Sequence, residues 1–205
     1  MTHTLKNLTL YVTAFLLVVL DQITKMMVKG FSLFGFDHQG MYIGESFNVL
    51  GDFLRITFVE NPGMAFGVEF GTGKIFLTLF SLIASFGLIY YLHIIKDAHR
   101  YVRIGIMLIL AGAFGNFIDR MFYGVIYGNS PLFYGLVVDF IQVDIPDITF
   151  NSITYTHWPV FNIADSCVSI GMVFLLFFNK FIPMPYQDTI ASHTSEQDKK
   201  TISNE

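Results

Sequence analysis

Residues Val160–Phe178 read VFNIADSCVSIGMVFLLFF, an apolar run that opens with two polar residues, Asn162 and Asp165. About 20 apolar residues in a helix span a bilayer, so this run predicts a transmembrane helix near the end of the chain. An aspartate at the centre of a bilayer costs about 2.5–3.5 kcal/mol. Asp165 therefore needs a specific role that accounts for its place at the start of a membrane helix.

The composition of the whole chain agrees with a membrane protein. Of its 205 residues, 53% are hydrophobic and 14% are charged, whereas a soluble protein has about 25% charged residues. Three more apolar blocks stand upstream, so we predict a mainly α, integral membrane fold, built as a four-transmembrane-helix bundle. The expected spans are residues 8–27, 75–95, 102–118 and 163–182.

The four spans are expected to form one membrane-embedded domain over residues 1–185, followed by a polar tail at 186–205. The tail lacks apolar residues to bury and is expected to be disordered in the cytoplasm. Orientation follows from the basic residues, because loops rich in Lys and Arg stay in the cytoplasm. Lys96, Arg100 and Arg103 gather in the link between the second and third spans, so both termini are expected to be cytoplasmic.

The two long loops, residues 28–74 and 119–162, are then expected on the outer side of the membrane. In the first loop, Leu54–Phe58 alternates apolar and polar side chains and leads to a Pro-Gly pair, which predicts a strand followed by a turn. Together with Phe47–Leu50 it predicts a small extracytoplasmic β-sheet. Aromatic loop segments nearby are expected to lie in the membrane interface.

Polar side chains that are costly in lipid fall at one depth, near the outer end of each span. Asp21 lies about 13 residues into the first span, roughly 20 Å from its cytoplasmic end at about 1.5 Å per residue. The whole set comprises Asp21, Asn61, Asn116, Asp119, Arg120, Asp139, Asn162 and Asp165. A shared depth indicates one polar site at the outer membrane interface.

Ordinary structural roles also fit single members of this set. Asp21 and Lys25 stand four residues apart and can form an ion pair on one helix face. Asn162 is of a type favoured at helix N-caps, and Asp165 in the first turn suits the helix dipole. A local ion pair would account for Asp119 and Arg120. An ordinary position on the surface would account for Asp139.

Several kinds of chemistry have no residues to support them. The chain has no H-E-x-x-H zinc motif, no glycine-rich phosphate loop, no G-x-S-x-G and a single cysteine. Carboxylates, amides and an arginine remain, which suit hydrolysis by two aspartates that share one proton when they lie close together. The formal charge of −4 gives no sign of nucleic-acid binding. A small transporter or channel stays open as the alternative, because polar residues also line such paths.

Five stretches of the chain resemble the lipoprotein signal peptidase (signal peptidase II) family of intramembrane aspartyl endopeptidases. They are DQITK from Asp21, NPGMAF from Asn61, AGAFGNFIDR ending at Arg120, VVDF containing Asp139, and FNIAD ending at Asp165. The resemblance covers nearly the whole chain up to about residue 185. It implies that Asp139 and Asp165 are the catalytic pair. It also implies that four residues bind the substrate or orient the pair, namely Asn61, Asn116, Arg120 and Asn162. A supporting role is implied for Asp21, Lys25, Gly63 and Asp119.

The resemblance further implies a reaction and its partners. The expected activity is hydrolysis of the peptide bond before the S-diacylglyceryl-cysteine of prolipoproteins, at the outer face of the bacterial inner membrane, which releases the signal peptide. No metal or cofactor is expected. The expected partners are the diacylglyceryl-modified prolipoprotein, membrane lipid and globomycin-type peptide inhibitors, with no nucleic acid, and the chain is expected to be a monomer.

The chain departs from the family pattern at two places. Ala111 stands where the third-span motif usually has a glycine. The segments 121–138 and 141–160 are longer than in compact family members. Their conformation and role do not follow from the resemblance.

Overall fold

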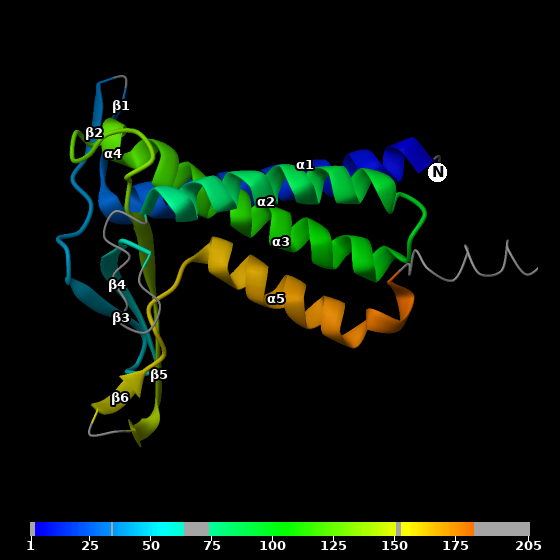
Figure 1. Cartoon of the computed structure of the whole chain (residues 1–205). Helices are drawn as coiled ribbons and strands as arrows, with labels where there is room; N and C mark the ends of the chain where they lie inside the picture. The colour runs from blue at the N-terminus through cyan, green and yellow to red at the C-terminus, as the bar shows by residue number, and fades with distance from the viewer. Residues whose placement is uncertain (1–2, 34, 64–73, 151–152, 183–205) are drawn as a thin grey trace, which may run out of the picture.

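The computed structural model describes residues 3–33, 35–63, 74–150 and 153–182. Within them, the helices that build the bundle are α1 (His3–Lys29), α2 (Lys74–Ile94), α3 (Arg100–Ile118) and α5 (Ile163–Phe177). α3 lies in the middle and packs against each of the other three (Figure 1). The mainly α membrane class is therefore confirmed. The predicted tail at 186–205 lies outside the described residues.

Three of these helical segments are long and apolar enough to cross a membrane, namely Leu8–Lys29, Lys74–Ile94 and Arg100–Ile126. The third span was expected to end at residue 118, but its helical path continues through a π-helical turn, η2 (Asp119–Tyr123), into the short α4 (Gly124–Ile126). The charged residue that marked the expected end, Asp119, is fully buried inside the bundle.

The last apolar block forms a shorter helix than expected. The segment 163–182 was predicted as one span, whereas α5 ends at Phe177 and is followed by a 3₁₀ turn, η3 (Asn179–Phe181). Ile182 has extended backbone angles of φ −71° and ψ 122°. The sequence places a proline next, and the residue before a proline avoids the helical region because of steric clash with the ring.

A four-stranded antiparallel sheet lies across one end of the helix bundle (Figure 1). Its order is β3 (Ser46–Leu50), β4 (Leu54–Asn61), β5 (Val137–Phe150) and β6 (Ile153–His157). A separate hairpin pairs β1 (Phe31–Leu33) with β2 (Phe36–His38). The strands predicted around residues 47–50 and 54–58 are confirmed, while β5 and β6 fall in a segment that was expected to be loop.

The register between β4 and β5 determines which side chains meet. Val59 lies opposite Asp139, and Asn61 lies opposite Val137. Asn61 and Asp139 are therefore diagonal neighbours on adjacent strands, within reach of each other's side chains. The first residues of β5, including Val138 and Phe140, are buried between the rest of the sheet and the helix ends.

Small residues let α3 approach α5 closely. A Cβ atom at Gly112 would collide with the backbone oxygen of Ala164. A Cβ atom at Gly115 would lie 2.7 Å from Oδ2 of Asp21 and 3.1 Å from Cβ of Ala164. The missing side chain of Gly115 therefore leaves the space that a carboxylate of α1 occupies between α3 and α5.

Candidate active site

Two carboxylates meet where the sheet joins the helix bundle. Asp139 comes from the start of β5 and Asp165 from the first turn of α5. Asn162 links them, because its Nδ2 donates to Oδ1 of Asp139 over 2.7 Å and its backbone N–H donates to Oδ2 of Asp165 over 3.2 Å. Asp139 is 2% exposed, whereas Asp165 is only partly buried. One carboxylate is thus enclosed and the other is open to a ligand.

Each carboxylate also accepts a hydrogen bond from a second amide. Asn61 Nδ2 donates to Oδ2 of Asp139 over 2.9 Å. Its other side-chain atom, Oδ1, accepts from the backbone N–H of Gly63 over 2.9 Å, which fixes the direction of the amide. Gly63 has φ +94°, a backbone conformation that side chains disfavour, so a glycine is needed in this turn. On the other side, Asn116 Nδ2 donates to Oδ1 of Asp165 over 2.7 Å.

The cap of α5 is part of the same arrangement. Asn162 is the N-cap residue, and its Oδ1 accepts from the backbone N–H of Asp165 over 2.8 Å. Because Asp165 accepts in return from the Asn162 backbone, the two form a reciprocal capping box. The explanation of Asn162 as the N-cap residue of the last helix is therefore correct. The same side chain also reaches Asp139, so the helix cap and the carboxylate pair are held by one residue.

A buried lysine lies behind the carboxylate pair. Lys25 is 0% exposed, and its Nζ lies 2.8 Å from Oδ2 of Asp21 and 2.7 Å from Oδ2 of Asp119. It also donates to Oδ1 of Asn116 over 2.9 Å. An ammonium group has three donors, and these three acceptors match them. Because Oδ1 of Asn116 is occupied by Lys25, the amide nitrogen of Asn116 turns toward Asp165.

The alternative explanation of Asp119, a local ion pair with Arg120, does not hold, because Asp119 pairs with Lys25. The π-helical turn rotates Asp119 toward α1, where it pairs with Lys25 and accepts from the backbone N–H of Val138 over 3.2 Å. π-helical turns within α-helices often occur at functional sites. Arg120 instead donates to the backbone oxygen of Asn116 over 3.3 Å, and its charge lies near both carboxylates of the pair.

The environment of Asp139 favours its neutral form. This residue belongs to β5, outside the membrane-spanning helices. Its pKa is raised to about 7, first by burial and then by the negative charge of Asp165, against the opposing hydrogen bonds from Asn61 and Asn162. Two carboxylates so close cannot both ionise without cost. Asp139 therefore keeps its proton up to about pH 7, and a carboxyl that stays protonated beside a second carboxylate suits combined acid and base chemistry.

Comparison with known proteins shows the family of the chain. The sequence model of the family described as Signal peptidase (SPase) II matches residues 13–181. The chain belongs to the signal peptidase II family. The predicted resemblance is thus confirmed, and the alternative, a small transporter or channel, receives no support. As a signal peptidase II, the chain is a peptidase of a bacterial membrane.

Relatives match this signal peptidase II over most of its length. A lipoprotein signal peptidase of Porphyromonas gingivalis is 38% identical over 188 residues, which cover 78% of each chain. One of Amoebophilus asiaticus is 32% identical over 207 residues, covering 92% of this chain and 85% of the relative. A solved structure described as a bacterial membrane enzyme is 32% identical, with a TM-score of 0.61 over 84% of this chain and 88% of that chain.

Sequence reasoning missed two polar residues that complete the site of this signal peptidase II. Gln22 donates to Oδ1 of Asp119 over 2.8 Å and to the backbone oxygen of Gly115 over 3.1 Å. Tyr123 donates its hydroxyl hydrogen to Oε1 of Gln22 over 3.1 Å. Gln22 lies inside the DQITK stretch next to Asp21, so its position in that stretch was the available signal. Nothing in the sequence singled out Tyr123.

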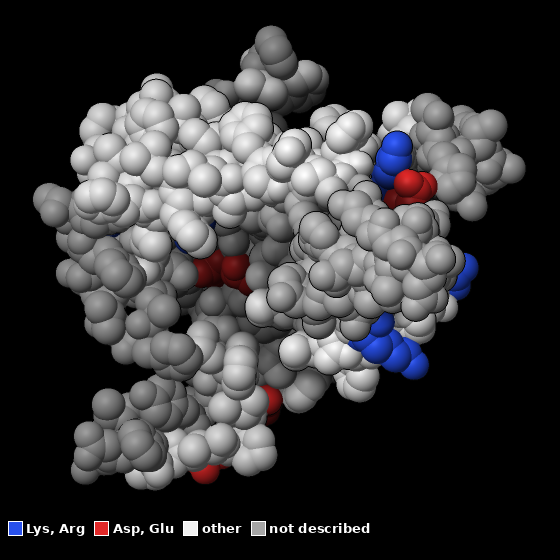
Figure 2. All heavy atoms as spheres, turned by 45° about the vertical axis from the view of Figure 1, so that its right-hand side comes forward, with Lys and Arg blue, Asp and Glu red and all other residues white. Residues whose placement is uncertain are grey.

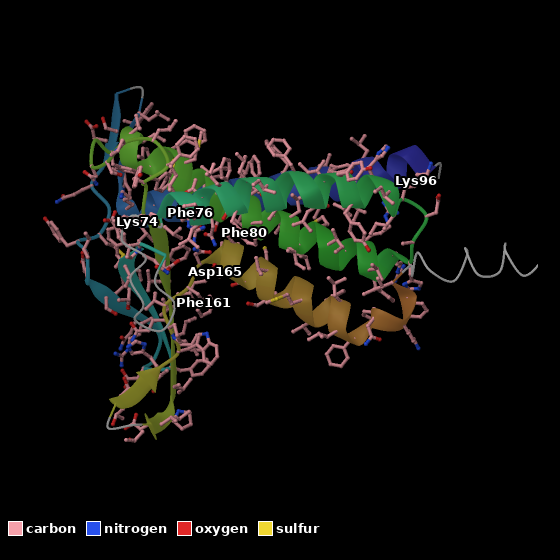
Figure 3. The ribbon with its side chains drawn as sticks, viewed as in Figure 1. Lys74, Phe76, Phe80, Lys96, Phe161 and Asp165 are labelled. Atoms are coloured by element: carbon pink, nitrogen blue, oxygen red, sulfur yellow. The ribbon has the colours of Figure 1, made fainter. Side chains whose placement is uncertain are left out.

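The site opens on a hollow in the molecular surface. Figure 2 shows acidic side chains at the base of a recess surrounded mainly by uncharged atoms. Figure 3 shows Asp165 at the sheet end of α5, with Phe76 and Phe80 projecting from α2 at the same level along the bundle. Both phenylalanines are more than two-thirds exposed, at 72% and 71%. Exposed apolar side chains therefore lie at the level of the site along the bundle.

Among the described residues, no group of three or more His, Cys, Asp or Glu side chains is placed to hold a metal ion. The carboxylates near the site are already engaged by amides or by Lys25. A reaction without metal or cofactor stays a prediction from the family resemblance.

Proposed function

We propose that this signal peptidase II hydrolyses the peptide bond before the S-diacylglyceryl-cysteine of prolipoproteins, and so releases their signal peptides. Asp139 and Asp165 act as its catalytic pair, which makes it an aspartic endopeptidase. The observation that carries the proposal is the link through Asn162, which donates hydrogen bonds to both carboxylates and fixes a strand residue beside a helix residue.

The pair performs acid and base steps with a single proton between its members. The ionised carboxylate takes a proton from a water molecule, whose oxygen attacks the scissile carbonyl carbon, while the protonated carboxyl donates to the carbonyl oxygen. The tetrahedral intermediate then collapses as a proton passes to the cysteine nitrogen, which is the leaving amine. Burial of Asp139, with its raised pKa of about 7, supports its role as the partner that holds the proton.

The surrounding polar residues position the pair and the substrate. Asn61, Asn116 and Asn162 orient the carboxylates through the hydrogen bonds described above. Arg120 borders the site and is placed to bind a substrate carbonyl. The remaining residues support this arrangement from behind; they are Asp21, Lys25, Gly63 and Asp119.

The chain crosses the bacterial inner membrane four times in this proposal, with α5 as the fourth crossing. Although α5 is short, it runs alongside α3 over most of the length of that helix. At one end Asn116 of α3 contacts Asp165 of α5, and at the other the rings of Tyr101 and Phe178 stack with centroids 4.3 Å apart. Because α3 is long enough to span, the antiparallel α5 with its 3₁₀ turn covers the same depth.

The basic residues orient the bundle. Lys96, Arg100 and Arg103 lie at the end of the bundle opposite the sheet, and Figure 3 shows Lys96 there. Loops rich in basic residues stay in the cytoplasm. This supports cytoplasmic termini, a sheet on the periplasmic face and a catalytic pair near that face, where the modified cysteine of a lipid-anchored substrate is held.

The test uses the purified full-length chain in detergent micelles. It is incubated with one prolipoprotein in two forms, with and without the diacylglyceryl group, and products are separated by gel electrophoresis. Only the lipid-modified form is expected to lose its signal peptide, and a globomycin-type peptide is expected to block the reaction because it occupies the same site. If the lipid-modified form were not cleaved, the proposed function would be rejected.

The pH dependence of the reaction follows from Asp139. Its pKa of about 7 means that the proton of the pair is lost as the pH rises through that value. We therefore expect kcat/KM to fall about tenfold per pH unit on the alkaline side of about pH 7, because both carboxylates are then ionised. Initial rates between pH 5 and about pH 9 would measure this. A rate that rises through pH 7 to an alkaline plateau would contradict the assignment.

A further inference from the structure

A groove lies in the corner between the sheet and α5, and Asp165 is one of the residues that line it. We call it the corner groove; its volume is 590 Å³, and its walls include Val143, Ile145, Trp158, Phe161 and Ile170. Ile170 comes from α5, while the first three residues come from the long segment 141–160. The corner groove thus joins the catalytic carboxylate to a wall built by the extended β5–β6 region.

The walls of the corner groove are mainly apolar, with Ser166 and Ser169 as polar members, and they are partly open to the surroundings. Trp158 is 59% exposed and Ile170 is 49% exposed. Exposed apolar patches next to a site mark surfaces that bind a ligand. Tryptophan is also enriched where a membrane meets water, because its ring is apolar and its N–H is polar. The corner groove therefore suits the apolar part of an amphiphilic ligand.

Trp158 is held in place by the sheet. Its backbone N–H donates to the backbone oxygen of Val143 over 2.9 Å. Three residues later, Phe161 and Ile141 exchange backbone hydrogen bonds of 3.0 Å and 2.7 Å. Both ends of the short stretch between Trp158 and Phe161 are therefore fixed on β5. The indole is presented by rigid backbone rather than by a free loop.

We propose that the corner groove binds an acyl chain of the diacylglyceryl group on the substrate cysteine, with Trp158 as a specificity-determining residue. This inference rests on the proposed function, because it takes Asp165 as catalytic. The modified cysteine directly follows the scissile bond. When that bond lies at the carboxylate pair, the glyceryl group stands beside Asp165 and therefore next to the corner groove, which Asp165 helps to line.

The size of the corner groove favours an acyl chain over the signal peptide. One turn of a helix about 10–12 Å wide and about 5.4 Å high fills roughly 400–600 Å³. The corner groove, at 590 Å³, is comparable in volume with a single helical turn. An apolar signal helix has several turns, whereas an extended hydrocarbon chain is thin enough to enter. In this proposal, the long segment 141–160 supplies part of the wall that contacts the acyl chain.

The test exploits the fact that Trp158 is the single tryptophan of the chain. The full-length Asp139→Asn variant is placed in lipid nanodiscs and given a synthetic prolipoprotein peptide whose acyl chains carry bromine, which quenches indole fluorescence at contact. We expect stoichiometric brominated peptide to quench Trp158. In a second arm, brominated phospholipid replaces the bulk lipid, and its quenching is expected to be relieved by unbrominated lipopeptide. The proposal would be overturned if the bound brominated lipopeptide did not quench Trp158. It would also be overturned if unbrominated lipopeptide did not relieve the quenching by brominated phospholipid.

Kinetics provide a second readout on the active protein. Wild type is expected to prefer a long-chain over a short-chain lipopeptide in kcat/KM, and Trp158→Ala is expected to reduce this ratio about tenfold. Trp158→Phe should restore most of it. The control is Ile148→Ala, which alters an exposed apolar side chain of β5 outside the corner groove and should keep the wild-type ratio. An unchanged ratio in Trp158→Ala rejects only the acyl site, whereas a wild type that cleaves nothing rejects the proposed function itself.

Discussion

Replacing Asp139 or Asp165 by asparagine is expected to lower kcat for prolipoprotein cleavage by about 10³–10⁴-fold. Asparagine keeps the size of the side chain but can neither take a proton from water nor give one to the scissile carbonyl. The loss should appear in kcat with little change in KM, because the substituted groups act on the reacting atoms. Single-turnover cleavage of a lipid-modified prolipoprotein by each purified variant would measure it.

The Asp139→Asn variant should stay folded, and its stability provides a separate check. The pKa of Asp139 in the folded chain, about 7, lies above the unfolded value of about 3.9. A raised folded pKa means that the stabilising contribution is present below the unfolded value and is lost as the pH rises through the folded one. Wild type should therefore lose thermal stability between about pH 4 and pH 7 relative to Asp139→Asn.

The matched control is Asp147→Asn, which removes an exposed carboxylate from the same strand, β5. Surface substitutions of this kind change stability by less than about 0.5 kcal/mol. Its activity should stay within the error of wild type. If either Asp139→Asn or Asp165→Asn kept substantial turnover under the same conditions, the carboxylate pair would not be the catalytic group.

The helices could be read from the sequence because lipid imposes a simple rule on them. A segment inside a bilayer must satisfy its own backbone hydrogen bonds, so a long apolar block becomes a helix. The boundaries were less certain where charges lie inside the bundle. Asp119 looked like the end of a span, yet its charge is matched by Lys25 and the helical path continues past it.

The strands β5 and β6 could not be predicted by the alternation that revealed β4. The start of β5, at residues 137–140, is buried on both faces because the sheet and the helix ends enclose it. A strand buried on both faces has no alternation of apolar and polar residues. Its continuation is exposed and mixed in character, so the pattern gave no signal there either.

The site was predicted as a set of residues at one depth, but its contacts were not predictable. Depth follows from counting residues along each span, which placed the polar side chains together. The choice of partner depends on how the helices rotate about their axes, and spacing along one helix does not determine it. Gln22 and Tyr123 illustrate the limit, since their contacts lie between elements about one hundred positions apart.

Lys25→Met is expected to destabilise the folded chain by about 3–5 kcal/mol. The change leaves the carboxylates of Asp21 and Asp119 buried without the cation that compensates them, at exposed fractions of 1% and 0%. Activity should fall as well, even in protein that stays folded. Without Lys25, Oδ1 of Asn116 loses its charged donor at 2.9 Å and keeps only the amide of Asn162 at 3.0 Å. The amide that orients Asp165 is then held less firmly.

Neutralising the two acids separates loss of charge balance from loss of packing. If uncompensated charge causes the destabilisation, adding Asp21→Asn and Asp119→Asn to Lys25→Met should restore most of the unfolding temperature, because a neutral cluster of similar volume replaces the ions. Cleavage should recover less than stability, since Asn116 still lacks the ammonium donor. Thermal unfolding in detergent and initial cleavage rates would measure the two effects on the same samples. A Lys25→Met protein with wild-type unfolding temperature and wild-type rate would show that the buried ion cluster supports neither the fold nor the carboxylate pair.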